Sequence, residues 1–562
     1  MQENNTNLRY YIGIAQGFIL YFLYISIQYK FQFAVNSLLF VPICTIVIFL
    51  PLLLQHGLNN LRIKTLILWS ISATILLSGL GYYDAWCSIT PITSNITPSI
   101  SLIWTLAFAL FILQSLIEGS DKDKKFVANY TTYFDVSWKL IIQLTLTVFF
   151  VSIFWSILFL TAALFTSIKI DFIKTIISYP WFYIPTTTVA FCTGLHITDV
   201  NATLVTGVRK VILTLFSYLL PVLVFFLVIF FASLPIKAVS ADLKIQNSES
   251  ILFFVSIWMV LLVNCAYQYG ENLNSFFKLA IKIGGVLLLP AILLSTYGLC
   301  LITENKGFSY GSVYQFILSA VLIFYGIGYL FIAFKIHFIK TWNLYAAYFI
   351  AAVLLLTLTP ALDPAKIVAD SQIKQIQANQ TNPEEFRFRI LLNDGERYGY
   401  NALLNFAQNS KTEKIAQQAN LTLSEKKNRY KKIRNKKNNT LIINTESGKL
   451  PKSFKDHFKK YNAEICPRFN NEPCSAWVKN IDDKMTVLIF KGNSMVAFQE
   501  EKTGVWKNTG SFTIPHNCPN SKKLLVDSKF KFIAPKPYPF PDLEINGTRF
   551  KFSPFRIYQE CD

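Results

Sequence analysis

Apolar runs long enough to cross a bilayer recur through residues 1–360 of this chain. A helix needs roughly 17–25 apolar residues to cross about 30 Å of hydrocarbon, and unpaired backbone groups in lipid are too costly for other open structures. The sequence therefore predicts an all-α polytopic membrane helical bundle of about eleven spans. These are Tyr10–Ile27, Phe33–Leu54, Leu66–Tyr82, Ile100–Ile117, Leu140–Ser167, Phe172–Ile197, Val211–Leu234, Ile251–Ala266, Leu279–Ile302, Val313–Phe334 and Trp342–Leu358.

Two of these spans decide on which side the chain ends. Phe172–Ile197 contains Pro180 and Pro185, so we expect it to be kinked or broken. Ile251–Ala266 is short. Ten spans instead of eleven would place the C-terminus on the opposite side. Tyr10–Ile27 is longer than the apolar core of a signal peptide and is interpreted as the first span.

The density of charge changes sharply near Pro360. Residues 1–360 hold 19 of the 53 Lys and Arg and 12 of the 33 Asp and Glu, and the shorter remainder holds the other 34 and 21. The first part is therefore suited to lipid and the second part to water. We expect the bundle (1–360) to be followed by a soluble α+β domain, composed of a helical, basic connector (361–437) and a β-rich part with four cysteines (438–562).

Periodicity supports this division of the soluble part. Apolar residues between Ala365 and Lys437 recur at helical spacing. Met485–Phe490, Met495–Gln499 and Gly504–Phe512 have the composition of short strands between turns. The prolines from Pro535 to Pro541 indicate an extended tract.

Short loops carry an uneven number of basic residues. With the N-terminus in the cytoplasm, 13 Lys and Arg face inside and 6 face outside, and Asp84–Ser99 contains none. Such a bias favours this orientation. Eleven spans would then place the C-terminal domain on the outer, periplasmic face of a bacterial inner membrane.

Cysteine usage is consistent with an outer-face domain. Cys44, Cys87, Cys192, Cys265 and Cys300 lie in or near the spans, where single cysteines act as small hydrophobic residues. Cys466, Cys474, Cys518 and Cys561 lie in the soluble domain and are candidates for two disulfides. The short spacing between Cys466 and Cys474 favours a disulfide between them, which leaves Cys518 to pair with Cys561. Three connectivities are possible for four cysteines. The alternative is that all four are free thiols in a cytoplasmic domain.

Two groups of polar residues are candidates for binding. Intramembrane polar side chains could line a cavity or join helices by hydrogen bonds; these are Gln16, Gln143, His196, Asn264 and Gln268. A basic run could contact anionic lipid or form a solvated connector; it contains Lys426, Lys427, Arg429, Lys431, Lys432, Arg434, Lys436 and Lys437. We expect no nucleic-acid partner, because that would require a cytoplasmic domain.

Two common enzyme motifs are absent from the sequence. It lacks a phosphate-binding G-x-x-x-x-G-K-[ST] loop and H-E-x-x-H. No C-x-x-C pair is present and the five histidines are scattered, so we expect no metal and no cofactor. One polar stretch between spans, Tyr82–Cys87 around Asp84, could belong to a membrane enzyme or to an aromatic interfacial belt.

Several short motifs give the chain a family resemblance. They are Arg9–Gly17, Tyr133–Trp138, Gly194–His196, Leu262–Gln268, Leu358–Pro364, Ser371-Gln372, Arg397–Gly399 with Ala402-Leu403, and Trp506–Cys518. In this order the chain resembles the bacterial domain-of-unknown-function 4153 family of multi-pass membrane proteins. Family members commonly carry an arginine before the tenth span, whereas Ser312 stands at that position here. The resemblance implies an architecture and no activity.

Three functions remain open from the sequence. The first is a non-enzymatic envelope protein whose bundle presents a domain that binds another envelope protein or polymer. The second is a transporter or carrier of small molecules or lipids, which the proline-broken sixth span would suit. The third is a membrane enzyme that acts on lipid-linked substrates.

Overall fold

The chain folds into two compact units, residues 1–427 and residues 428–562. The computed structural model describes residues 2–91, 96–168, 170–239, 248–271, 273–378, 388–410, 412–436, 443–447, 450–461, 474–481, 484–491, 494–502, 504–513, 531–533, 542–545 and 548–550. The predicted proline tract from Pro535 to Pro541 lies outside the described residues.

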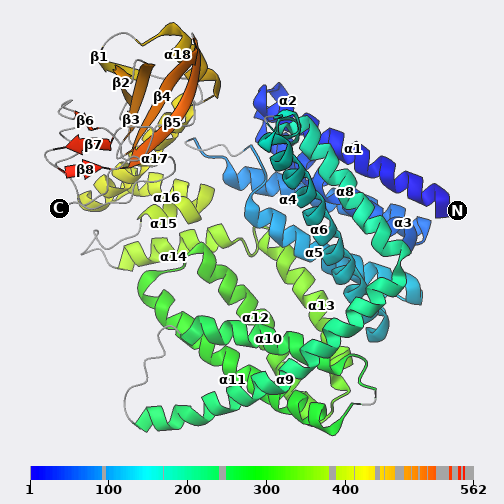
Figure 1. Cartoon of the computed structure of the whole chain (residues 1–562). Helices are drawn as coiled ribbons and strands as arrows, with labels where there is room; N and C mark the ends of the chain where they lie inside the picture. Colours follow the sequence, from blue (N-terminus) through cyan, green and yellow to red (C-terminus); the bar gives the residue numbers. More distant parts are fainter. Residues whose placement is uncertain are drawn as a thin grey trace. The chain divides into compact units, whose positions relative to one another are not determined.

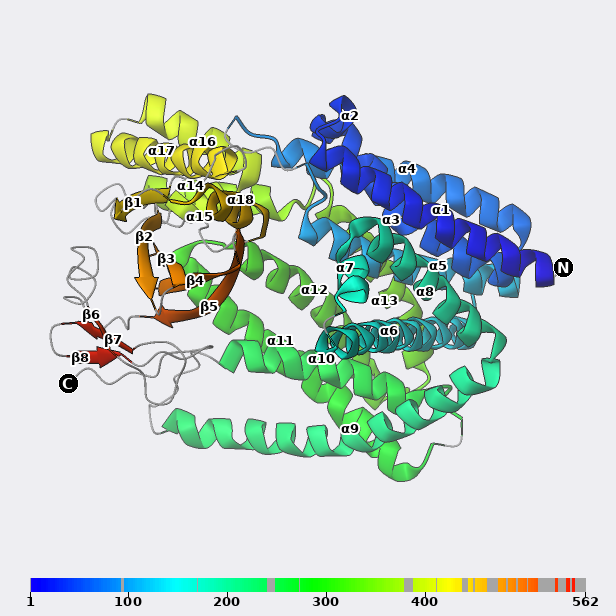
Figure 2. The same cartoon turned by 45° about the horizontal axis from the view of Figure 1, so that its top comes forward.

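Long helices make up the membrane part of the first unit (Figures 1 and 2). Ten of them, among the described residues, are long and apolar enough to span a membrane. In chain order the helices are α1 (Gln2–Gln28), α2 (Gln32–Val35), α3 (Ser37–Asn60), α4 (Ile63–Ser88), α5 (Ile100–Asp123), α6 (Tyr130–Ser167), α7 (Phe172–Ser178), α8 (Pro180–Val200), α9 (Ala202–Val239), α10 (Ser248–Tyr267), α11 (Ser275–Lys306), α12 (Tyr310–Leu330), a 3₁₀ turn (Phe331–Ala333) and α13 (Phe338–Thr357).

The expected sixth span is broken into α7 and α8 at Pro180, which is the first residue of α8. Its prolines, threonines and His196 make α8 less apolar than the ten candidate spans. It nevertheless runs along the bundle, because Asp199 near its end bonds Arg9 near the start of α1. The start of α1 and the end of α3 share one end of the bundle, where Arg9 and Asn59 both bond Asp199. Asp363, which follows α13, bonds Tyr83 near the end of α4 and so lies at the opposite end.

The bundle has two main cores. One joins α9 to α12 and includes Tyr130 and Phe134 of α6. The other joins α3, α4 and α5 around residues such as Leu77 and Leu106. A smaller cluster of Leu116, Leu344 and Ala347 packs α5 against α13 and links the two halves. Both cores are built from side chains that the apolar runs supply.

Two glycines on α1 allow a close approach of α8. Gly13 and Gly17 are spaced as in small-xxx-small helix contacts. A Cβ atom on Gly17 would lie 2.4 Å from Thr188 Oγ1 and 2.6 Å from Pro185 Cα. The backbone of α8 therefore occupies the space that a side chain at position 17 would need.

We expect Gly17→Ala to destabilise the bundle by about 1–3 kcal/mol, because overpacking forces backbone shifts. Thermal unfolding of the purified protein in detergent would measure this loss. Gly79→Ala is the matched control, because a Cβ atom at Gly79 meets nothing within 4 Å. A melting temperature that falls equally in both variants would contradict the close contact.

Four helices follow the bundle: α14 (Pro364–Ala378), α15 (Phe388–Asp394), α16 (Glu396–Asn409) and α17 (Glu413–Lys436). The helical prediction for this region is confirmed. A core that includes Ile376, Leu391, Leu403 and Ile415 holds them together. Residues 364–426, which belong to the first unit, are named the helical cap below.

The second unit contains a sheet with strand order β1-β2-β3-β4-β5. Its strands are β1 (Ile443–Ser447), β2 (Cys474–Ile481), β3 (Lys484–Lys491), β4 (Ser494–Lys502) and β5 (Val505–Thr513). β1 pairs with β2 in parallel and the other pairs are antiparallel. The three strands expected from the sequence are confirmed as β3, β4 and β5.

Helix α18 (Lys452–Tyr461) covers one face of this sheet. Its Phe454 and Phe458 pack against Phe498 and Trp506, and the Trp506 ring nitrogen donates to Ser453 Oγ at 3.2 Å. A separate three-stranded sheet contains β6 (Lys531–Ile533), β7 (Asp542–Ile545) and β8 (Thr548–Phe550). The fold class of a membrane helical bundle with a soluble α+β part is therefore confirmed.

Candidate functional site

The helical cap is fixed to the end of the bundle where α4 and α13 finish. Asp363 is buried and caps the N-terminus of α14, where its Oδ1 accepts from the Ala365 N–H at 2.8 Å. Its Oδ2 accepts from the Tyr83 hydroxyl at 2.5 Å and lies 3.5 Å from Cys87 Sγ. One carboxylate thus starts the cap and ties it to α4.

A second set of bonds joins the cap to the start of α12. Gln372 on α14 donates to the Phe308 carbonyl at 2.9 Å, and the Phe308 N–H donates to Ser371 Oγ at 3.1 Å. Asp394 at the end of α15 accepts from the Tyr310 N–H at 3.1 Å. Ser312 forms a capping box with Ser309 at the start of α12.

Arg397 and its neighbours hold α16 against α4 (Figure 1). The Arg397 guanidinium lies 4.3 Å from the centre of the Trp86 ring and donates to the Trp86 carbonyl at 3.3 Å. Tyr398 contacts the same ring edge-on, and its hydroxyl is 3.1 Å from that of Tyr83. The stretch Tyr82–Cys87 was predicted to be an aromatic interfacial belt or part of a membrane enzyme. In the structure its side chains form the surface on which the cap packs.

The tight turn between α15 and α16 requires glycine at position 399. A Cβ atom there would lie 1.8 Å from the Leu391 carbonyl oxygen, a backbone atom that has no freedom to move away alone. We expect Gly399→Ala to destabilise the cap by about 1–3 kcal/mol. Hydrogen exchange of cap peptides would report the loss as faster exchange over residues 388–409. In Gly311→Ala, where a Cβ atom meets nothing within 4 Å, those peptides should exchange as in the unchanged protein.

Glu396 is the ionisable group whose environment in the cap is most unusual. It lies half-buried at the start of α16, next to the carboxylates of Asp84 and Asp363. Burial, followed by the charges of Asp84 and Asp363, raises the pKa of Glu396 to about 7, and Lys426 opposes the shift. Burial lowers the pKa of Lys426, whose Nζ donates to the Leu392 carbonyl at 2.7 Å. The group can therefore exchange a proton near neutral pH.

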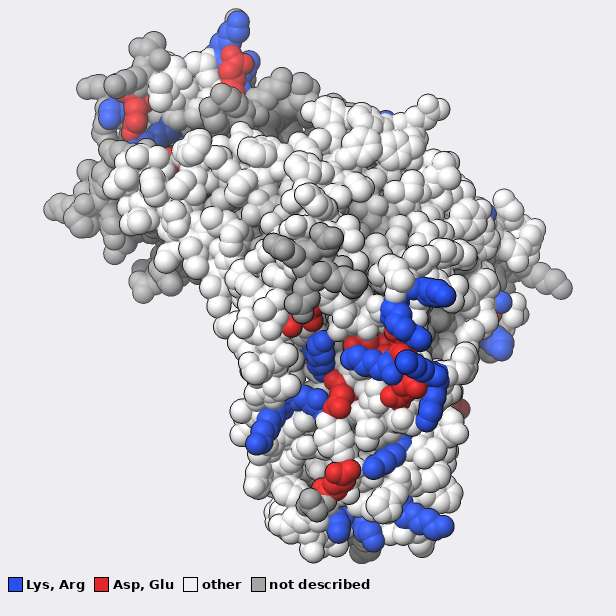
Figure 3. Space-filling model, turned by 90° about the vertical axis from the view of Figure 1, so that its right-hand side faces the viewer, with Lys and Arg blue, Asp and Glu red and all other residues white. Residues whose placement is uncertain are grey.

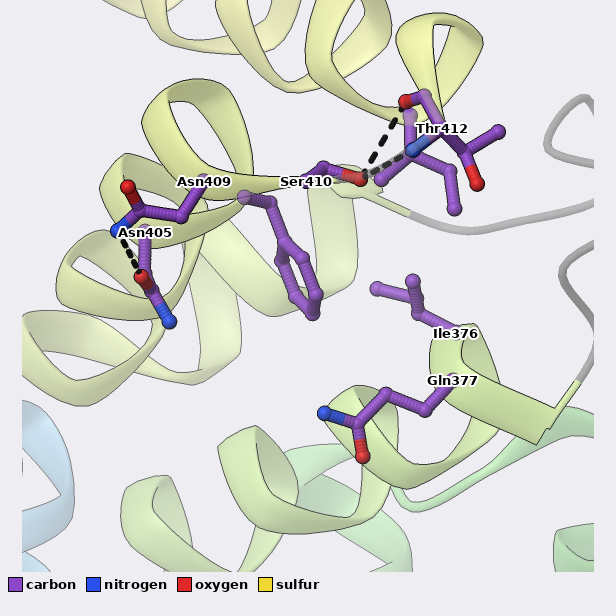
Figure 4. A pocket seen from close by; sticks show the side chains of 8 residues that line it. Ile376, Gln377, Asn405, Asn409, Ser410 and Thr412 are labelled. Carbon is purple, nitrogen blue, oxygen red and sulfur yellow. Dashed lines mark hydrogen bonds between the residues drawn. The ribbon is translucent and has the colours of Figure 1, made fainter.

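A pocket of about 230 Å³ lies within the cap, between α14, α16 and the start of α17 (Figure 4). Its described lining consists of amides, hydroxyls and apolar side chains, without a charged residue. These are Ile376, Gln377, Asn405, Phe406, Asn409, Ser410, Thr412 and Ile415. Asn409 donates to Asn405 Oδ1 at 2.7 Å, which leaves the Asn405 amide nitrogen and the Gln377 amide directed to the pocket region (Figure 4). The pocket suits a neutral ligand that forms hydrogen bonds.

The predicted intramembrane polar residues fall into separate groups. Gln16 donates to the carbonyls of Val47 (3.2 Å) and Ile48 (3.1 Å). The Val47 carbonyl lacks its usual helical donor, because Pro51, four residues further on, has no N–H. Gln143 donates to Asp199 Oδ1 at 3.3 Å. Both residues join helices of the α1–α8 half.

Asn264 belongs to the other half. It donates to the Tyr329 hydroxyl at 2.9 Å, Tyr329 donates to Asn343 Oδ1 at 2.9 Å, and Asn343 returns a bond to Asn264 Oδ1 at 2.6 Å. This ring joins α10, α12 and α13. Gln268 follows α10 in a left-handed conformation, and the His196 ring packs edge-on against Tyr10. Among the described residues, these candidates do not meet in one cavity.

Charged side chains gather at the end of the bundle where α1 begins, which faces the viewer in Figure 3. Arg9, only 1% exposed, pairs with Asp199 at 3.0 Å, and Asn59 donates to the same carboxylate at 2.9 Å. Lys139 completes this group at 3.5 Å. The sequence could not pair Arg9 with Asp199, because these two residues are 190 positions apart.

The cysteine and basic-run predictions lie largely outside the described side chains. Cys466, Cys518 and Cys561 fall outside the described residues, and Cys474 begins β2 without a described side chain, so the disulfides stay a prediction. The cysteines at 44, 87, 192, 265 and 300 are free, and all but Cys300 are buried. In the basic run only the Lys426 side chain is described; Lys427, Arg429, Lys431, Lys432, Arg434 and Lys436 lie on α17, and Lys437 lies outside the described residues.

The pocket residues were missed from the sequence, although Asn405 and Asn409 share one face of a helix at a spacing of four. Together, the pocket and Glu396 give the cap a place for a neutral ligand and a group that titrates near neutrality. The described residues contain no cluster of His, Cys, Asp and Glu that could hold a metal ion. No protein-family model, curated protein or solved structure matches this chain.

Proposed function

We propose that this integral membrane protein is a non-enzymatic envelope protein of the bacterial inner membrane, of the domain-of-unknown-function 4153 type, that presents a binding cap outside the cytoplasm. The observation that carries the proposal is the uncharged, amide-lined pocket of the cap. Amide groups both donate and accept hydrogen bonds, and the Phe406 ring offers an apolar surface beside them. This combination fits a sugar unit of an envelope glycan.

The proposed orientation rests on charge. The end of the bundle where α1 begins holds Arg9, Arg62, Lys122, Lys139 and Arg209, which form ion pairs there. The positive-inside bias assigns that end to the cytoplasm. The helical cap is bonded to the opposite end, and it therefore faces the periplasm. The second unit continues from the cap and would share its compartment, where the predicted disulfides could form.

Binding and topology can be tested on the full-length protein. In lipid nanodiscs, titration with soluble N-acetylated glycan fragments should give saturable binding, and an Asn405→Leu, Asn409→Leu double variant should bind about tenfold more weakly. Asn393→Leu, which alters an exposed amide of the same cap, should bind as the unchanged protein does. A reporter fused after residue 562 should be active only in the periplasm.

Two results would contradict the proposal. Binding of unrelated peptides but of no glycan would assign the pocket to a protein partner. A cytoplasmic reporter would place the cap inside the cell. The carrier hypothesis has less support, because the described intramembrane polar candidates occupy separate groups.

Glu396 favours a second candidate function, a membrane enzyme at the outer interface. A carboxyl group with a pKa of about 7 suits general acid–base catalysis, and Tyr83 and Asp84 of α4 place it at the end of a span. This function requires that Glu396→Gln abolish turnover of a lipid-linked substrate while glycan binding persists. Unchanged turnover would exclude Glu396 as the catalytic group.

A further inference from the structure

A second cavity, of about 160 Å³, lies inside the membrane part, between α3, α5, α6 and α8. Ten of its twelve lining residues are apolar, among them Phe49, Leu53, Leu110, Leu144 and Phe191. The two polar ones are His56 and Gln114. All twelve belong to the long helices, so this cavity lies at the depth of lipid and suits a short segment of a hydrocarbon chain.

Gln114 places an unpartnered donor beside this apolar lining. The residue is 2% exposed, and its Oε1 accepts from the Trp69 ring nitrogen at 2.8 Å. Among the residues that the structure describes, its buried Nε2 has no hydrogen-bond partner. Because Trp69 only donates, this bond fixes the orientation of the amide and leaves Nε2 as the free donor. An unpaired donor in apolar surroundings is costly, and an ester carbonyl of a lipid would satisfy it.

His56 lies between the cavity, which it lines, and the charged end of the bundle. Its Nε2 lies 2.8 Å from Glu118 Oε2, and Lys122 pairs with the same carboxylate at 2.7 Å. Asn60 donates to the His56 carbonyl at 2.8 Å and accepts from Lys139 at 2.8 Å. The polar end of the cavity is therefore bordered by lysines from two helices.

The cations at this border are exposed while the acids are buried. Side-chain exposure is 41% for Lys122 against 0% for Glu118, and 58% for Arg62 against 4% for Asp121. Lys139 is 30% exposed and its partner Asp199 is 10% exposed. A molecule that approaches this surface meets positive charge, because the carboxylates lie beneath it. The surface is complementary to an acidic headgroup.

We propose that this cavity is a binding site for an anionic glycerophospholipid. Part of one acyl chain occupies the apolar cavity, an ester carbonyl accepts from Gln114 Nε2, and the phosphate group contacts Lys122 and Lys139. The inference is independent of the function proposed for the cap, because it concerns the opposite end of the bundle.

Native mass spectrometry of the full-length protein in detergent tests this site. The protein is incubated with equal amounts of phosphatidylglycerol and phosphatidylcholine that have the same acyl chains. We expect one phosphatidylglycerol to be retained. Gln114→Leu should reduce the retained fraction threefold to tenfold, and Leu144→Trp, which fills the cavity, should abolish retention. Lys122→Gln should remove the preference for phosphatidylglycerol.

The matched control for Leu144→Trp is Leu160→Trp, a change on the same helix at a residue that is 74% exposed. It should retain phosphatidylglycerol as the unchanged protein does. If Leu144→Trp fails to fold, Leu144→Phe fills part of the space and should still lower retention. Equal retention of both lipids by the unchanged protein, or full retention in a folded cavity-filling variant, would overturn the proposal.

Discussion

Replacing Asp199 with leucine is expected to reduce the free energy of unfolding of the bundle by about 3–5 kcal/mol, the usual cost of breaking a buried ion pair. The reason is Arg9. Its side chain is 1% exposed, and its Nε and Nη1 atoms have no hydrogen-bond partner in the described part of the chain. Asp199 is the carboxylate that compensates its charge, so the variant leaves a cation buried next to Lys139.

Thermal unfolding in detergent, followed through the reaction of buried cysteines with a thiol-reactive dye, measures this loss. Cys192 is a suitable reporter, because its Sγ lies 3.3 Å from the Arg9 carbonyl. The double variant Arg9→Leu, Asp199→Leu should recover much of the stability, since it removes both charges. Asp135→Leu is the control: its partner Arg209 is 15% exposed and Asp135 is 49% exposed, so water replaces the lost ion pair. Equal losses at positions 199 and 135 would contradict the argument.

Raising the pH from 5 to 8 is expected to weaken the cap by about 3 kcal/mol through Glu396. The pKa of Glu396 is raised from 4.5 to about 7 in the folded protein. Below pH 4.5 the carboxyl group holds its proton in both states and has no effect. Between pH 4.5 and about 7 the unfolded chain has already released the proton, whereas the folded state still holds it. As the pH rises through these values, the free energy of unfolding therefore falls by about 1.4 kcal/mol for each unit of the pKa shift.

Hydrogen exchange over residues 396–409, corrected for the intrinsic effect of pH, would detect this weakening. Glu396→Gln should keep the cap equally protected at pH 5 and pH 8, because glutamine does not titrate. Glu413→Gln, at an exposed position of α17, should leave the pH dependence of the unchanged protein. If the Glu396→Gln cap still loosens at pH 8, another group is responsible.

Hydrophobic patterning predicted the bundle, because a helix that crosses lipid needs apolar residues along its whole length. It also predicted the break in the expected sixth span, which falls at Pro180 between α7 and α8, from the missing N–H of proline. The strands β3 to β5 were predicted for a similar reason, since alternation and turn glycines are local properties of the chain.

The contacts of the cap could not be predicted in this way. Tyr83 and Asp363 are 280 residues apart, and neither is unusual in its own segment. The same is true of Arg9 and Asp199. Pairing between distant residues depends on how helices are arranged around each other, which the period of a single helix does not specify. Glu396 likewise owes its pKa to neighbours from other segments.

The two cores of the bundle have a consequence for biogenesis. Helices α1 to α8 find most of their packing partners among themselves, and so do α9 to α12. The first group can assemble in the membrane while the ribosome is still translating the second. The packing of α13 against α5 closes the assembly last, after nearly the entire hydrophobic segment has left the translocation machinery.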